Sequence, residues 1–245
     1  MKELPFKANE GKQLTAQTDW GTYARYPIGT HVIMKEDVMH DVLDKYVREY
    51  IEPDDMIFIS EKIVAITQGR AFDINEIKVS RLAKFLVRFV YKSDAGIGIG
   101  APSTMELCLR DCGRIKVLFA AMIAAVCKLF GKRGVFYNIL GMKARAIDGP
   151  SKDNVPPYDH YAKLAPDKPD EAAADYKEYL GVKAVVIVDA NDLGCNVLGK
   201  SSKDIPDEFC LQLYKDNPHD QGFRQTPLAI VRRVPAQDDD LKKTL

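Results

Sequence analysis

The chain has 245 residues, of which 46% are hydrophobic and 29% are charged, and its 35 basic and 35 acidic residues give a net charge of zero at pH 7. This length and balance are typical of one large globular domain, or two small ones, with a substantial core. The balanced charge argues against a nucleic-acid-binding surface and leaves only a local basic patch open.

The first part of the chain is predicted to mix short strands and helices. Residues 1–25 are polar and weakly periodic, so we expect an irregular N-terminal arm. Residues 30–34 are a strand candidate, and apolar residues at helical spacing predict a helix over residues 36–51. A strand over residues 56–60 is expected to pass into a less regular segment that closes on Gly69 and Arg70.

The middle of the chain contains a glycine-spaced loop followed by a helix. Ser103 and Glu106 fit a capping box at its start, and Gly113 fits its end. The apolar run over residues 117–127 predicts a segment covered by the core or by a second chain. The stretch over residues 131–141 predicts a turn and a strand.

The last part is predicted to contain a helix and two strands. The helix starts near Pro169 and ends at Gly181, and the strands cover residues 185–188 and 226–234. Because strands and helices do not alternate strictly, we expect an α+β fold with mixed sheets. The main domain would cover residues 26–234, followed by a solvated tail over residues 235–245.

The cysteines and the N-terminus indicate a cytoplasmic protein. The five cysteines are odd in number, and no Cys-x-x-Cys pair occurs, so reduced thiols are expected. The N-terminus lacks the apolar core of a secretory signal. The longest apolar run is far shorter than the ~20 residues that span a bilayer, so we expect no membrane partner.

Two aspartates follow predicted strands and are candidate metal ligands. Asp189 comes directly after a run of β-forming residues, with Asn191 behind it, and Asp148 precedes a loop that contains Asn154. Carboxylate and amide oxygens are the ligands that hard divalent cations prefer. The alternative at both places is an ordinary turn, in which Asp and Asn bond to their own backbone.

Two further features can bind phosphate. Lys62 and Arg70 are cations near a strand end, although isolated cations are more often simply solvated. Glycines at 96, 98 and 100 precede a helix and can hold an anion on backbone N–H groups, or they form a flexible loop. No Rossmann or Walker pattern occurs, and no Gly-x-Ser-x-Gly or His-Glu-x-x-His motif supports a hydrolase.

Several segments together resemble the coenzyme F-420 gamma-glutamyl ligases. DDMIFISEKIVAITQGR resembles an early motif of that family, and AIDGPSKDNV resembles its metal loop. LAPDKPDEAAADYKEYLGVKAVVIVDAND is the most similar stretch, and DQGFRQTPLAIVRR resembles the closing segment. The likeness runs in order over most of residues 26–234.

The resemblance implies a fold, a reaction and a set of site residues. It implies an α+β fold in an intertwined homodimer, and an enzyme that joins glutamate to a carboxylate of a deazaflavin-like or folate-like acceptor, using GTP or ATP with Mg²⁺ or Mn²⁺. The implied metal ligands are Asp148, Asn154, Asp189 and Gln221. The implied nucleotide-binding residues are Lys62, Gly69, Arg70 and Asn191. The resemblance assigns no catalytic residue.

The chain also departs from the family pattern near Asp189. Ala190 replaces a threonine, and Cys195 replaces an arginine. These changes favour the alternative of a non-catalytic relative that binds a nucleotide or metabolite. The retained Asp148, Asp189 and Gln221 favour the ligase over that alternative, and a hydrolase of nucleotides or phosphoesters would rest on the metal site alone.

Overall fold

The computed structural model describes residues 4–90, 98–152, 154–191, 194–220 and 224–235. The chain groups into two compact units. One, called the sheet unit here, contains residues 1–31, 38–60 and 168–245. The other, called the helical unit, contains residues 32–37 and 61–167.

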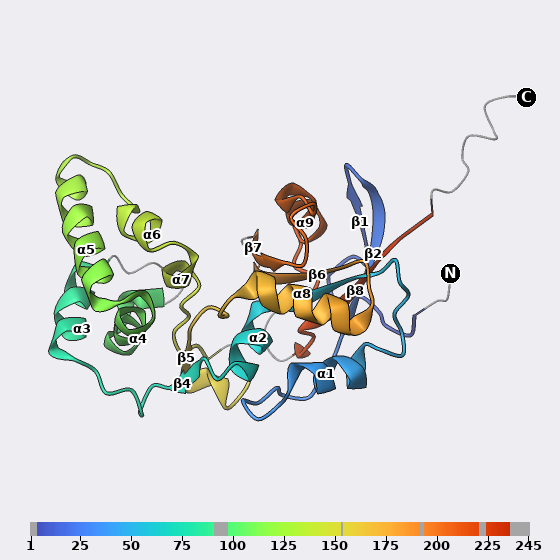
Figure 1. Ribbon diagram of the computed structural model, residues 1–245, viewed down its shortest axis with the longest axis horizontal. Coiled ribbons are helices and arrows are strands. Elements are labelled where there is room, and N and C mark those ends of the chain that lie inside the picture. The colour runs from blue at the N-terminus through green and yellow to red at the C-terminus, as the bar shows by residue number, and fades with distance from the viewer. Residues whose placement is uncertain (1–3, 91–97, 153, 192–193, 221–223, 236–245) are drawn as a thin grey trace, which may run out of the picture. The chain divides into compact units, whose positions relative to one another are not determined.

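The sheet unit is built on a mixed six-stranded sheet with the order β1-β2-β8-β3-β6-β7 (Figure 1). Strands β3 and β6 are parallel, and the other neighbouring pairs are antiparallel. The strands are β1 (Thr15–Thr18), β2 (Gly21–Ile28), β3 (Met56–Ser60), β6 (Ala184–Asn191), β7 (Gly194–Lys200) and β8 (Leu228–Arg233). Its helices are α1 (Met39–Tyr46), α8 (Pro169–Leu180) and α9 (Asp207–Leu213).

Continuous apolar runs explain why β3 and β6 lie inside this sheet. Residues 56–59 and 184–188 are buried along their whole length, as expected for strands that are covered on both faces. On one face, Phe58 and Val186 pack in a core cluster with Phe209 and Leu213 of α9. The sheet therefore carries the end of β6 on a rigid support.

The helical unit has a small hairpin and a bundle of short helices. Its strands are β4 (Ala71–Asp73) and β5 (Tyr161–Lys163), which pair antiparallel. Its α-helices are α2 (Glu61–Thr67), α3 (Arg81–Leu86), α4 (Pro102–Cys112), α5 (Arg114–Leu129), α6 (Val135–Leu140) and α7 (Met142–Arg145). The 3₁₀ turns are η1 (Val87–Phe89), η2 (Gly98–Gly100) and η3 (Tyr158–His160). Met105, Leu107 and Leu109 of α4 belong to the core of this unit.

The α+β prediction is confirmed, and several of the predicted elements are confirmed with it. The strand over residues 56–60 is β3, and the helix that begins at Pro169 is α8, which Gly181 ends with a φ of 70°. The helix predicted over residues 36–51 is shorter and covers only α1. The less regular segment expected after β3 is instead the helix α2.

Three predictions of local structure are wrong. Residues 30–34 form no strand. The backbone N–H of Thr30 donates a hydrogen bond to Gln225 O, and neither residue belongs to a strand. Residues 135–140 form the helix α6 rather than a strand, since a short apolar run fits either structure. The stretch expected to be an irregular arm contains β1 and β2, whose threonine and tyrosine side chains favour strands.

The capping box predicted for α4 is also wrong. The N-cap residue is Ala101, and the Glu106 carboxylate instead accepts a hydrogen bond from the backbone N–H of Ser80 at 3.0 Å. The predicted stop is confirmed, because Gly113 ends α4 with a φ of 87°. Glu106 thus ties the start of α3 to α4.

The apolar run over residues 117–127 lies in α5 and is not a buried core segment. Only Val117 and Ala120 of this helix are buried, whereas the side chain of Met122 is 61% exposed. Among the described residues, no helix is long and apolar enough to cross a membrane.

Candidate functional site

A buried ion pair organises the charged residues of the helical unit. Glu61 is the first residue of α2 and is 3% exposed, and its carboxylate bonds to the ammonium of Lys163, which is 5% exposed. Two buried charges of opposite sign stabilise each other only at close range, so this pair fixes the start of α2 on β5.

The same lysine places Asp148. Lys163 Nζ lies 3.8 Å from Asp148 Oδ2, and the two residues exchange two backbone hydrogen bonds of 2.9 Å each. The Asp148 side chain is 58% exposed, so its carboxylate is held at its base and open to solvent at its tip. This is a suitable position for a ligand of a cation.

Lys62 and Asn154 meet, as expected for members of one site. Lys62 Nζ donates a hydrogen bond of 2.9 Å to Asn154 Oδ1, and Asn154 Nδ2 donates one of 3.4 Å to Tyr158 O. The Tyr158 hydroxyl in turn donates to Ile33 O at 2.8 Å, and burial raises the pKa of Tyr158 to about 12. The loop that carries Asn154 is therefore held at both its side chain and its backbone.

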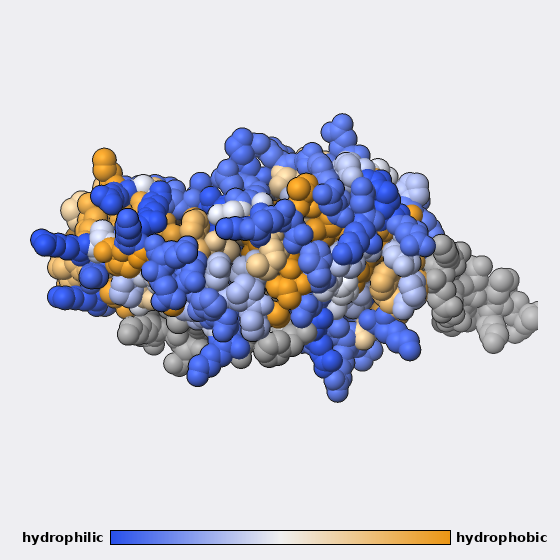
Figure 2. All heavy atoms as spheres, turned by 90° about the horizontal axis from the view of Figure 1, so that it is seen from below, coloured by the Kyte–Doolittle hydropathy of each residue, from blue (hydrophilic) through white to orange (hydrophobic). Residues whose placement is uncertain are grey.

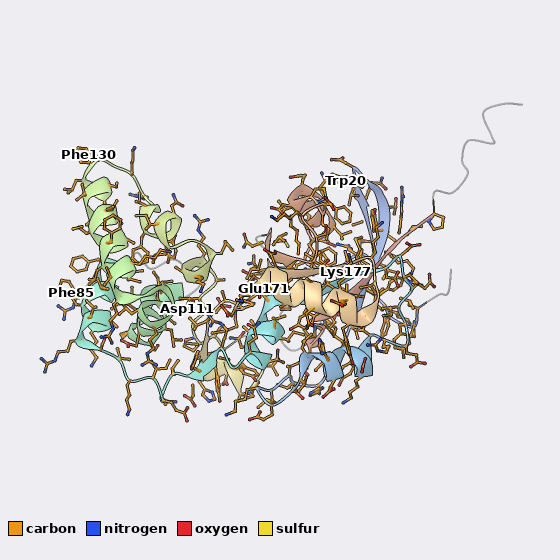
Figure 3. All side chains as sticks on the ribbon, viewed as in Figure 1. Trp20, Phe85, Asp111, Phe130, Glu171 and Lys177 are labelled. Carbon is orange, nitrogen blue, oxygen red and sulfur yellow. The ribbon has the colours of Figure 1, made fainter. Side chains whose placement is uncertain are left out.

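Arg70 follows α2 and has close partners of its own. Gly69 ends the helix with a φ of 68°, a conformation that favours glycine. Arg70 Nε donates to Ala165 O at 2.5 Å, and Nη2 donates to Asp111 Oδ1 at 2.6 Å. Asp111 lies on α4, where Figure 3 labels it, and its side chain is only 9% exposed. The Arg70 guanidinium thus compensates a nearly buried carboxylate.

Asp189 and Asn191 lie near the end of β6 in the sheet unit. They are not in a turn, because the strand continues through both residues and pairs with β7, with Asp189 opposite Asn196. Side chains two residues apart in a strand point to the same face, so Asp189 and Asn191 share a face with Ile187. Burial changes at this point, from buried residues up to Val188 to half-buried ones from Asp189 on.

The predicted site residues therefore fall into two groups. Asp148, Asn154, Lys62 and Arg70 belong to the helical unit, and Asp189 and Asn191 belong to the sheet unit. Gln221 lies outside the described residues, as do Gly96 of the glycine loop and the tail from residue 236. Within the described part of the chain, no group of three or more His, Cys, Asp or Glu side chains gathers as a metal site.

The donor chemistry of both groups nevertheless fits a hard divalent cation. Each group offers one aspartate and one asparagine, and Mg²⁺ and Mn²⁺ prefer such oxygen ligands. In the helical unit, Asn154 Oδ1 is already oriented by Lys62, and the exposed Asp148 carboxylate is oriented through Lys163. The oxygen atoms of both residues are thus of the type that binds such a cation.

Three charged residues that pair with or next to the candidate site residues were not predicted from the sequence: Glu61, Lys163 and Asp111. Glu61 stands next to Lys62 at the end of an apolar strand, and Lys163 stands between Ala162 and Leu164, which are both buried. A charge inside an apolar stretch usually has a partner of opposite sign, and this rule would have pointed to both. Asp111 had no such signal, because its position on α4 resembles that of any exposed helical acid.

Comparison with known proteins identifies a family. The family model for F420-0:gamma-glutamyl ligase matches residues 27–202, well over half of the chain. None of the curated proteins matches the chain. The chain therefore belongs to the F420-0:gamma-glutamyl ligase family.

Proposed function

We propose that this member of the F420-0:gamma-glutamyl ligase family joins L-glutamate to the carboxylate of a coenzyme-like acceptor, at the expense of GTP or ATP and with Mg²⁺ or Mn²⁺. The family supports a ligase that forms a C–N bond. The finer proposal is supported by the hydrogen bond from Lys62 Nζ to Asn154 Oδ1, which brings the lysine ammonium beside an oxygen atom of the type that binds Mg²⁺. The acceptor would be deazaflavin-like or folate-like.

The reaction needs an activated acceptor, because a free carboxylate does not react with an amine at neutral pH. A carboxylate oxygen of the acceptor attacks the terminal phosphorus of the nucleotide, and the bond from that phosphorus to the bridging oxygen breaks. The products are an acyl phosphate and a nucleoside diphosphate. The glutamate nitrogen then attacks the acyl carbon, phosphate leaves with the bonding pair, and the amine loses a proton.

The residues of the chain would bind and orient the reactants. The resemblance to the family implies that Asp148, Asn154, Asp189 and Gln221 are metal ligands, and oxygen atoms of these residue types suit a hard cation. When bound, the metal neutralises charge that develops on the transferring phosphoryl group. Lys62 supplies a positive charge beside Asn154, where it can bind a nucleotide phosphate.

The other candidate residues have supporting roles in this proposal. Gly69 and Arg70 form the turn after α2, and Asn191 shares a strand face with Asp189. If Arg70 moved to a phosphate, Asp111 would stay nearly buried without its partner. Arg70 therefore contributes by fixing the turn after α2 through its bonds to Ala165 and Asp111.

A second function, binding without catalysis, is favoured by one observation. Cys195 stands where the family has an arginine and lies opposite Ala190 in the β6–β7 pair. Burial raises the pKa of the Cys195 thiol to about 12, so this position carries no charge at neutral pH. A protein that lacks this positive charge can bind a nucleotide and still transfer its phosphoryl group poorly.

Nucleotide binding by titration calorimetry tests the assignment of Lys62. The variant Lys62→Met removes the charge and keeps the length of the side chain, and it should weaken Mg²⁺–GTP binding by about 10- to 100-fold. Lys84→Met removes an exposed lysine of α3 in the same unit and serves as the matched control. Equal binding by both variants would show that Lys62 does not contact the nucleotide.

We also propose a homodimer. Its best candidate interface is β1, which lies at one edge of the sheet, because an edge strand can pair with a second chain. Trp20 follows β1 and is 40% exposed (Figure 3). Sedimentation equilibrium decides the matter, since a mass near 27.5 kDa would exclude the dimer.

A further inference from the structure

Helix α5 has apolar side chains on two opposite faces. Val117 and Ala120 point into the core of the helical unit. On the other face, Ile115 is 86% exposed, Met122 is 61% exposed and Leu129 is 85% exposed. A surface helix of a globular protein normally has a polar outer face, so this second apolar face needs an explanation.

The exposed apolar residues form a continuous stripe. They recur every three or four residues, which places them on one side of the helix. The stripe covers the 16-residue helix from its first turn to its last and ends at Phe130, which Figure 3 labels at the end of α5. The exposed members of the stripe are Ile115, Leu118, Phe119, Met122, Val126, Leu129 and Phe130.

The stripe is bordered by positive charge. Residues 113–147 contain seven basic residues and no acidic one, in a chain whose net charge is zero. Arg114 and Lys116 are exposed at the start of α5, and Lys128, Lys132 and Arg133 are exposed at its end. In Figure 2, apolar atoms (orange) and hydrophilic atoms (blue) lie interspersed over the helical unit, at the left of the view.

A shallow pocket at the start of α5 has the same mixed character. Apolar and basic side chains line it together: Leu109, Ile115, Phe119, Arg110, Arg114 and Lys116. The nearby acids give it little negative charge, because Glu106 is 2% exposed and pairs with Arg110 and Arg114. The pocket can therefore accept a molecule that is both apolar and anionic.

Pairing of α5 with the same helix of a second copy is a poor explanation of this face. In such a pair, a twofold axis passes next to α5 and the helix meets its own copy. Antiparallel α5 helices would place Lys128 and Lys132 beside Arg114 and Lys116 of the other copy, and parallel helices would place like ends together. Both arrangements bring basic residues against basic residues, with no acidic residue in residues 113–147 to separate them.

We propose that the outer face of α5 binds the surface of an anionic lipid bilayer. Amphipathic helices lie in the interface of a membrane with apolar side chains among the acyl chains and basic ones at the headgroups. The stripe that begins at Ile115 supplies the apolar side chains, and the basic residues at both ends of α5 supply the positive charges for the headgroups. Such a contact lies on the membrane and requires no segment that spans it.

Co-sedimentation of the full-length protein with vesicles tests this inference. One set of vesicles contains phosphatidylcholine alone, and the other contains about one-third phosphatidylglycerol. The protein should bind the anionic vesicles and not the neutral ones, and binding should weaken as salt rises from ~0.1 to ~0.5 M. No binding to the anionic vesicles would overturn the proposal.

Two variants separate the contributions of charge and apolar surface. Lys128→Glu/Lys132→Glu/Arg133→Glu should bind anionic vesicles at least about tenfold more weakly, since each basic residue near such a surface strengthens binding by about fivefold. Leu129→Ser/Phe130→Ser should also reduce binding. Equal binding by these variants and the unchanged protein would contradict the proposal.

The controls show whether the effect belongs to α5. Lys183→Glu/Lys203→Glu/Lys215→Glu changes the net charge equally at exposed positions of the sheet unit, and it should bind as the unchanged protein does. Circular dichroism confirms that each variant is folded. If Leu129→Ser/Phe130→Ser instead converts a dimer into a monomer in sedimentation, the face is a contact between copies and the membrane proposal fails.

Discussion

Replacing Lys163 by methionine tests whether the buried ion pair holds the helical unit together. Glu61 is 3% exposed and Lys163 is 5% exposed, so Lys163→Met leaves a carboxylate buried without its ammonium. Loss of one partner from such a pair destabilises a protein by about 3–5 kcal/mol. Whole domains are stable by only about 5–15 kcal/mol, so the loss is a large fraction of the total.

Thermal unfolding followed by circular dichroism measures this loss. For a chain of this size, each kcal/mol changes Tm by about 2–4 °C, so Tm should fall by roughly 6–20 °C. The double variant Glu61→Gln/Lys163→Met removes both charges and should recover most of that stability, to within about 1–2 kcal/mol.

A surface ion pair of the same unit provides the control. Lys35 Nζ and Glu36 Oε1 are 3.6 Å apart, and their side chains are 73% and 68% exposed. Exposed pairs contribute less than about 1 kcal/mol, so Lys35→Met should change Tm by only a few degrees. A loss for Lys163→Met no larger than that of Lys35→Met would refute the reasoning, as would a double variant less stable than either single one.

Three further predictions concern thiol reactivity, pH dependence and packing. The hydrogen bond with Cys108 lowers the pKa of the Cys112 thiol, so the fast phase of labelling by Ellman's reagent at pH 8 should disappear in Cys112→Ser. Burial lowers the pKa of His219 from 6.5 to about 4. Below pH 6.5 this histidine takes up a proton in the unfolded chain but stays neutral in the folded one, so the folded state is destabilised as the pH falls from 6.5 to 4. The free energy of unfolding should therefore fall by about 3 kcal/mol between pH 6.5 and pH 4 in urea titrations, and His219→Gln should flatten this decrease. A Cβ on Gly199 would lie 2.4 Å from the backbone of the first residue of α8, so Gly199→Ala should cost about 3 kcal/mol in the same titrations, whereas Gly29→Ala, with its nearest contact at 3.9 Å, should cost less than about 1 kcal/mol.

The elements that were predicted correctly are those marked by a pattern of neighbouring residues in the sequence. β3 was identifiable because its run of apolar residues is buried along its length, and the end of α8 was identifiable because Gly181 adopts a left-handed conformation. The helix α6 was missed because its short apolar run fits a strand equally well, and its packing against α5 is not visible in the sequence.

The candidate site was predictable in part. Asp148 and Asp189 were identified because each follows a predicted strand. The family was identified because several similar segments occur in the same order along the chain. The pairing of Glu61 with Lys163 was not predictable, since 102 positions separate these residues and only the tertiary fold brings them together. The partner of Arg70 on α4 escaped for the same reason.

The exposed face of α5 shows a second limit of prediction from sequence. An apolar run of this length predicts burial, yet sequence alone does not say whether the cover is the core, a second chain or a lipid surface. The structure removes the first option, because Met122 and Leu129 are exposed.

Mass spectrometry of the acceptor tests the central claim most directly. The protein is incubated with F420-0, L-glutamate, GTP or ATP, and Mg²⁺ or Mn²⁺, with parallel reactions that contain a folate in place of F420-0 or that omit glutamate. The ligase proposal predicts an acceptor that gains one glutamyl residue, together with release of one phosphate per bond formed and only when glutamate is present. Nucleotide turnover that is equal with and without glutamate, and leaves both acceptors unchanged, would contradict it.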